Sequence, residues 1–320
     1  MPALPGRDFR HPQAWGGEVG PVAVPSQQAR PVAARPESIA APFAALVIAA
    51  VAMGLSPILV RLAEVGPFTS AFWRVTLALP VLYGWMRISE RGRTEPVRRF
   101  PRATLWVGLA FAADLFFWHL AIVTTTVANA TLFATTAPIW VVLFGWLMFR
   151  KRVSAGVLAG LGLCILGGGA LLAQSLQARV GTALGDLFGL VTGVFFGLYF
   201  LAVQAARKGR SAARVTFEAT VITAALLLLV ALGLEHQLLP RTLHGVAALV
   251  AMAWVSHAGG QGLLTVALGH LPATFSSLVI FLEAIAAACL AWAILGEPVT
   301  AIQAGGGLAI LAGIYIARPR

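Results

Sequence analysis

The sequence predicts an all-α membrane protein whose ten transmembrane helices form two inverted five-helix repeats. Three observations lead to this fold class. Hydrophobic residues make up 59% of the 320 residues and charged residues only 11%, with a mean hydropathy of +0.85, whereas about a quarter of a soluble domain is charged. Apolar runs of roughly 20 residues recur, each long enough to cross about 30 Å of hydrocarbon as a helix. The second half of the chain also echoes the first.

Residues 1–42 precede the first apolar run. Seven prolines and four arginines lie within residues 1–40, a composition typical of a disordered tail, and no signal-peptide pattern is present. We therefore expect a cytoplasmic tail, 1–42, a first repeat, 43–173, and a second repeat, 184–317. The expected spans are 43–63, 67–86, 103–123, 126–148, 154–173, 184–205, 213–234, 243–268, 272–294 and 299–317.

The repeat appears when the chain is shifted by 146 positions. The hairpin "FRKRVS" then coincides with "LGEPVT", so helix ends fall in phase. Identities at this shift include Leu132 with Leu278, Ile139 with Ile285, Trp146 with Trp292, Gly160 with Gly306 and Gly167 with Gly313.

The distribution of basic residues predicts orientation. Fifteen Lys and Arg residues fall on one side of the spans and three, Arg61, Arg179 and Arg241, on the other. The richer side is the cytoplasmic one in membrane proteins, so both termini are expected in the cytoplasm. Five spans per half is an odd number, so the second half is expected to be inverted relative to the first. Inverted repeats around a midplane site are typical of secondary transporters.

Several polar residues are predicted at mid-depth in apolar spans. Asp114 and Glu283 are carboxylates, and His257 is followed one turn later by Gln261. An ionised group inside a membrane is costly, so these residues either form a proton relay or substrate clamp, or fix helix packing by hydrogen bonds. Arg74 has two open interpretations, binding of a substrate carboxylate and pairing with Asp114.

Deep aromatic residues have similar alternatives. Trp118, Trp140, Trp254 and Tyr199 lie too deep for an interfacial belt, which leaves core packing or the wall of a cavity. The complete set of substrate-binding candidates is Arg74, Asp114, Trp118, His119, Asn129, Trp140, Tyr199, Trp254, His257, Gln261 and Glu283.

Small residues and prolines predict close packing and kinks. Glycines recur every fourth residue from Gly185 to Gly197, and others lie in the fifth and tenth spans, a pattern that brings helix backbones together. Pro57 and Pro138 are expected to bend their helices. Arg61 and Glu64 are expected to form a surface pair.

Three pieces of the chain carry a family resemblance. They are "FWRVTLALPVL", "TVANATLFATTAPIWVVLFGWLMFRKRVS" and "SSLVIFLEAIAAACLAWAILGEPVT". The chain resembles the drug/metabolite transporter superfamily, specifically its EamA-type members, over about residues 43–317. Ala284 stands where these members commonly have a proline. The resemblance implies two copies of a five-helix unit and the export or exchange of small metabolites such as amino acids.

The function predicted is a secondary transporter that exports or exchanges a small organic metabolite, an amino acid or related compound, by alternating access around a midplane cavity. The alternatives are an intramembrane enzyme and a channel. No HExxH, GxSxG or Walker motif supports an enzyme, and no repeated filter supports a channel.

The expected partners are a small-molecule substrate, the lipid bilayer and protons as a candidate coupling ion, with no cofactor. The net charge of +11 lies mostly in short loops, so a nucleic-acid partner is rejected. The expected location is the plasma membrane, or the inner membrane of a bacterium, as a multi-pass protein.

Overall fold

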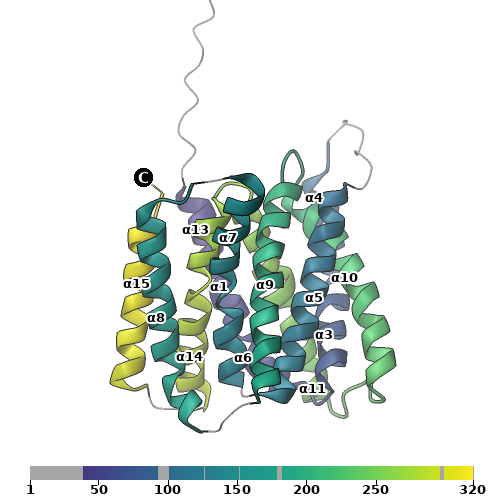
Figure 1. The fold of residues 1–320 in the computed structure, drawn as a ribbon. Helices are drawn as coiled ribbons and strands as arrows, with labels where there is room; N and C mark the ends of the chain where they lie inside the picture. Colours follow the sequence, from purple (N-terminus) through teal and green to yellow (C-terminus); the bar gives the residue numbers. More distant parts are fainter. Residues whose placement is uncertain are drawn as a thin grey trace, which may run out of the picture. The chain divides into compact units, whose positions relative to one another are not determined.

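The computed structural model describes residues 39–92, 101–125, 127–150, 152–178, 182–295 and 299–319. All regular secondary structure in these ranges is helical, and the helices run side by side (Figure 1). Among the described residues, Ala40–Leu62, Arg102–Thr124, Ala183–Ala206, Ala212–Leu234, Leu243–Ala267 and Ala273–Leu290 are long and apolar enough to cross a membrane. The prediction of an all-α membrane protein is confirmed.

The helical segments join end to end into about ten rods, at the positions expected from the apolar runs. They are α1 (Ala40–Gly54) with α2 (Ser56–Leu62), α3 (Pro67–Thr76) with α4 (Leu79–Ser89), α5 (Arg102–Thr124), α6 (Val127–Ala134) with α7 (Ala137–Phe149), α8 (Ala155–Ala178), α9 (Ala183–Ala206), α10 (Ala212–Leu234), α11 (Leu243–Ala251) with the π-helix η1 (Met252–Gln261) and α12 (Gly262–Ala267), α13 (Ala273–Val279) with α14 (Leu282–Leu295), and α15 (Ala301–Ala317).

Among the breaks within α1–α2, α6–α7 and α13–α14, two follow from proline, and the break between α3 and α4 also precedes a proline, Pro80. Pro57 and Pro138 occupy the first turns of α2 and α7. Proline lacks the N–H that would continue the preceding helix, and its ring clashes with the carbonyl one turn back. The kinks predicted at these two residues are therefore present as breaks between α1 and α2 and between α6 and α7.

A third interruption, between α13 and α14, contains no proline. The amide of Phe281 donates to the carbonyl of Leu278 over 3.1 Å, and that of Glu283 donates to Ile280 over 2.8 Å. These bonds span three residues instead of four and tighten the turn. The break at residues 280–281 lies 145 positions after the break at 135–136, within one residue of the 146-position shift.

Glycines allow two close helix contacts, as the sequence predicted. A Cβ at Gly160 of α8 would lie 2.4 Å from the carbonyl oxygen of Gly313 in α15, and one at Gly167 would lie 2.4 Å from that of Gly306. The two helices lie side by side in Figure 1. The glycines of α9 meet α6 and α7 in the same way, and a Cβ at Gly193 would lie 2.8 Å from the carbonyl oxygen of Phe133.

Helix α5 occupies a central position. It packs along α9 and α10 and also contacts α3 and α6. The residues predicted on α5 therefore face several helices at once, and both α3 and α9 lie close enough to contribute to a shared site.

Candidate functional site

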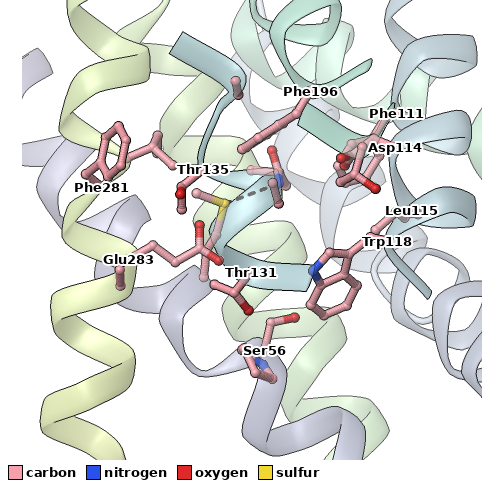
Figure 2. A pocket seen from close by; sticks show the side chains of 18 of the residues that line it. Ser56, Phe111, Asp114, Leu115, Trp118, Thr131, Thr135, Phe196, Phe281 and Glu283 are labelled. Carbon is pink, nitrogen blue, oxygen red and sulfur yellow. Dashed lines mark hydrogen bonds between the residues drawn. The ribbon is translucent and has the colours of Figure 1, made fainter. Parts of the chain in front are cut away.

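A cavity lies where α1, α2, α3, α5, α6, α7, α9, η1 and α14 approach one another, together with the break between α13 and α14. The space between its lining atoms, including the part continuous with the outside, is about 750 Å³. Figure 2 shows side chains from these helices pointing into a common space.

The breaks within α1–α2, α6–α7 and α13–α14 all line this cavity. Ser56 and Pro57 come from the first, Thr135 and Pro138 from the second, and Phe281 from the third. At membrane depth, backbone that leaves the regular helix is tolerated where it lines a cavity or is buried in protein. Broken helices that meet at a site are a feature of secondary transporters.

Three charged residues reach the cavity without partners. Arg74 and Asp114 are 5% and 7% exposed, and Glu283 is partly buried. No hydrogen bond or ion pair joins any of the three to another described residue, and the buried Nε of Arg74 is unsatisfied. Arg74 lines the same cavity as both carboxylates. In Figure 2, Glu283 and Asp114 approach from opposite sides.

This arrangement is energetically unusual. Removing a charged group from water costs several kcal/mol after relaxation, and a close hydrogen-bonded partner normally offsets part of that cost. Arg74 does not close onto either carboxylate in this structure. The three groups are thus available to a ligand, or to protons in the case of the two carboxylates.

Aromatic side chains form the apolar part of the wall. Trp118 was predicted, whereas Phe111, Phe196 and Phe281 were not. Phe111 precedes Asp114 by three residues, so the two share a face of α5. That spacing was the one signal in the sequence that pointed to Phe111.

Gln261 also lines the cavity. Tyr199 does not line it but forms a hydrogen bond with Gln261. The hydroxyl of Tyr199 donates to Oε1 of Gln261 over 3.0 Å, and Nε2 of Gln261 donates to Sδ of Met53 over 3.2 Å. Tyr199 also lies against Phe111, with ring centroids 5.0 Å apart. It is therefore placed to orient the Gln261 amide.

The two predicted histidines lie outside the cavity. The ring of His257 stacks on Phe111 at 5.4 Å, and its Nε2 lies 2.9 Å from Oγ1 of Thr220. His119 donates from Nδ1 to the carbonyl of Leu115 over 2.6 Å. Both are fully buried in the packing around the cavity, and neither lines it in this structure.

Two predicted tryptophans are placed elsewhere. Trp140 packs against α9 and donates to Oγ1 of Thr136 over 3.2 Å. Trp254 is 55% exposed and donates to the carbonyl of Leu77, at the break between α3 and α4. Neither of the two lines the cavity in this structure. The side chain of Asn129 lies outside the described part of the structure.

Of the predicted residues, the cavity thus brings together Arg74, Asp114, Trp118, Gln261 and Glu283. Within the described residues, no group of three or more His, Cys, Asp or Glu side chains is arranged to hold a metal ion.

A family model for the EamA-like transporter family matches the chain twice, over residues 41–172 and 183–318. Among curated proteins, an "Uncharacterized transporter" from Archaeoglobus fulgidus is 27% identical over 274 residues, which is 86% of this chain and 95% of that protein.

A solved structure titled "Crystal structure of protein" superposes with a TM-score of 0.74 at 19% identity. The match covers 88% of this chain and 97% of the other. At that identity, the similarity establishes a shared fold.

Proposed function

Because this chain belongs to the EamA-like transporter family, and so to a family of small-molecule transporters, we propose that it is a secondary transporter. It exports or exchanges a small organic metabolite, an amino acid or a related compound, by alternating access around the cavity. The observation that carries this proposal is the set of unpaired charges formed by Arg74, Asp114 and Glu283.

The charges favour a ligand with both an anionic and a cationic group. A guanidinium binds a carboxylate through two parallel hydrogen bonds, so Arg74 takes the ligand carboxylate. Asp114 and Glu283 take the ligand ammonium group from opposite sides (Figure 2). Such a ligand would satisfy all three protein groups at once, which no pair among them does.

The wall favours an apolar or aromatic ligand side chain. Trp118, Phe111, Phe196 and Phe281 present ring surfaces to the same space. Aromatic pairs in offset or edge contact contribute about 0.5–1.5 kcal/mol beyond the area that they bury. Aromatic amino acids are therefore the first compounds to test.

The proposal includes two inverted repeats, which the contact between α8 and α15 supports. At the shift of 146 positions, Gly160 corresponds to Gly306 and Gly167 to Gly313. Gly160 contacts Gly313, and Gly167 contacts Gly306, so the two contacts exchange equivalent residues, as a two-fold relation requires. The order of these contacts also makes the two helices antiparallel.

A further contact fits the same relation. The Sγ of Cys164 lies 3.7 Å from the carbonyl oxygen of Ile310, which is the residue equivalent to Cys164 itself. A residue that meets its own equivalent lies close to a two-fold axis. Because the axis crosses antiparallel helices, it runs perpendicular to them and thus in the plane of the membrane, as in inverted-repeat transporters.

The distribution of basic residues supports an orientation with both termini in the cytoplasm. Protons are the candidate coupling ion, since Asp114 and Glu283 are carboxylates in a site with a single guanidinium. A bound proton on one of them leaves the other to pair with Arg74 or with the ligand.

A ligand screen on detergent-purified protein tests the proposal. A ligand that binds only the folded state stabilises it by about 2.7 kcal/mol at 100 times its Kd. We expect L-phenylalanine, L-tryptophan or another amino acid to raise the melting temperature, and 2-phenylethylamine and 3-phenylpropionate to raise it less. Equal shifts with the amine or the acid alone would contradict the zwitterion, and no shift with any amino acid would contradict the substrate class.

A further inference from the structure

A carboxylate from one loop binds the start of the helix that carries Arg74. Glu235 directly follows α10, and its Oε1 and Oε2 accept hydrogen bonds from the backbone amides of Phe68 and Thr69, at 2.7 and 3.0 Å. Pro67, the first residue of α3, has no N–H to offer. Glu235 therefore satisfies the first two amides that α3 presents.

The surrounding residues are shaped for this contact. A Cβ at Gly66 would lie 2.3 Å from the carboxyl carbon of Glu235, so a side chain at this position would require the carboxylate to move. Farther along α3, Nε1 of Trp73 donates to the carbonyl of Leu238 over 2.6 Å. The 235–242 loop thus holds α3 at two points.

Arg74 depends on α3 for its position. It lies five residues after Thr69 in the same uninterrupted helix, which is about 7–8 Å along the axis at 1.5 Å per residue. Its guanidinium has no hydrogen bond to another described residue. Since no contact of its own fixes the side chain, the placement of the helix decides where the guanidinium sits.

We propose that Glu235 is a positioning residue for the transport site. By binding the start of α3 it sets the depth and direction of Arg74 in the cavity. The inference rests on the proposed function for the role of Arg74, but the position of residue 74 can be tested independently of any substrate.

Glu64 provides a matched control. It was expected to pair with Arg61, but its Oε1 instead accepts from Oγ1 of Thr242 over 2.8 Å and its Oε2 from the Thr242 amide over 3.0 Å, at the start of α11. It thus also binds the 235–242 loop, at the opposite end from Glu235, but it accepts no hydrogen bond from an amide of α3. Helix α11 contributes no charged side chain to the cavity.

The first experiment uses Arg74→Cys with Cys164 and Cys289 replaced by alanine, and measures the rate of labelling by the cationic reagent methanethiosulfonate ethylammonium. Loss of a helix cap is expected to change this rate about tenfold in Glu235→Ala. Glu235→Gln, which keeps one acceptor, is expected to restore most of the original labelling rate. Glu64→Ala is expected to leave the rate within about twofold of the value without the substitution. A rate within twofold in Glu235→Ala, or an equal change in Glu64→Ala, would overturn the proposal.

The second experiment keeps Arg74 and compares L-phenylalanine with 2-phenylethylamine, which lacks the carboxylate. Glu235→Ala is expected to reduce the ratio of their affinities about tenfold, as Arg74→Gln does, with binding of the amine unchanged. If Arg74→Gln leaves the ratio unchanged, the proposed function fails, and the labelling rates still decide the positioning role. If Arg74→Gln lowers the ratio and Glu235→Ala does not, the positioning role fails alone.

Discussion

Replacement of Gly160 by alanine tests the contact between α8 and α15. The added methyl group would lie 2.4 Å from the carbonyl oxygen of Gly313 and 2.8 Å from Cβ of Ala317. Carbon and oxygen atoms in contact are normally about 3.3–3.6 Å apart, so the helices must separate by about 1 Å. A gap of that size forfeits a quarter to a half of each dispersion contact along the seam.

The expected cost follows from this displacement. Overpacking of this kind costs about 1–3 kcal/mol. Gly162 is the control, since it lies on the same helix and a Cβ there meets no atom within 4 Å. Alanine at that position is neutral or gains up to about 1 kcal/mol from helix propensity. The two variants should therefore differ by roughly 1–4 kcal/mol.

Thermal unfolding of detergent-purified protein, followed by tryptophan fluorescence, measures the difference. A change of 1 kcal/mol moves the melting temperature by about 2–4 °C in proteins of 150–250 residues, so Gly160→Ala should melt several degrees below Gly162→Ala. Gly306→Ala, which meets the carbonyl of Gly167 at 2.6 Å, should show a similar drop. Equal melting of Gly160→Ala and Gly162→Ala would refute the close contact.

Three further predictions concern the site. Glu283→Gln and Asp114→Asn should each abolish counterflow of substrate in liposomes while leaving membrane insertion intact, and wild-type rates in both would remove the carboxylates from the mechanism. Tyr199→Phe should weaken ligand binding about tenfold, measured as Kd, because Oε1 of Gln261 loses its buried donor; an unchanged Kd would exclude the orienting role. Trp254→Phe should transport within about twofold of wild type, because the indole is exposed outside the cavity, and a large loss would show that the exposed face takes part.

The sequence predicted the charged part of the cavity because charge in an apolar span is a strong signal. Arg74, Asp114 and Glu283 were identified from their cost in hydrocarbon, and the structure places all three at the cavity. The phenylalanines of the wall could not be found in this way. Phe196 and Phe281 are as apolar as the residues that pack the core, so residue type gives no distinction.

The positions of His257 and Trp254 outside the cavity have a geometric cause. Both lie in η1, where the helix widens into a π-helix, so residues do not recur on one face with the usual period of 3.6. The depth of these two residues in the membrane could be predicted from the sequence. The direction in which their side chains point around the helix axis could not. The pairing expected for Glu64 failed because a contact across 178 positions to Thr242 leaves no local pattern.

The two halves of the chain interrupt corresponding helices with different chemistry. Pro138 stands just after the break between α6 and α7, and its equivalent after the break between α13 and α14 is Ala284. Proline forbids the missing bond permanently, whereas alanine has an amide that can form it. The break between α13 and α14 therefore keeps the amide for a regular helical bond, and the break between α6 and α7 lacks it. Glu283 lies in the first turn after this break, so the carboxylate of the second half follows the interruption at which the backbone bond is not blocked.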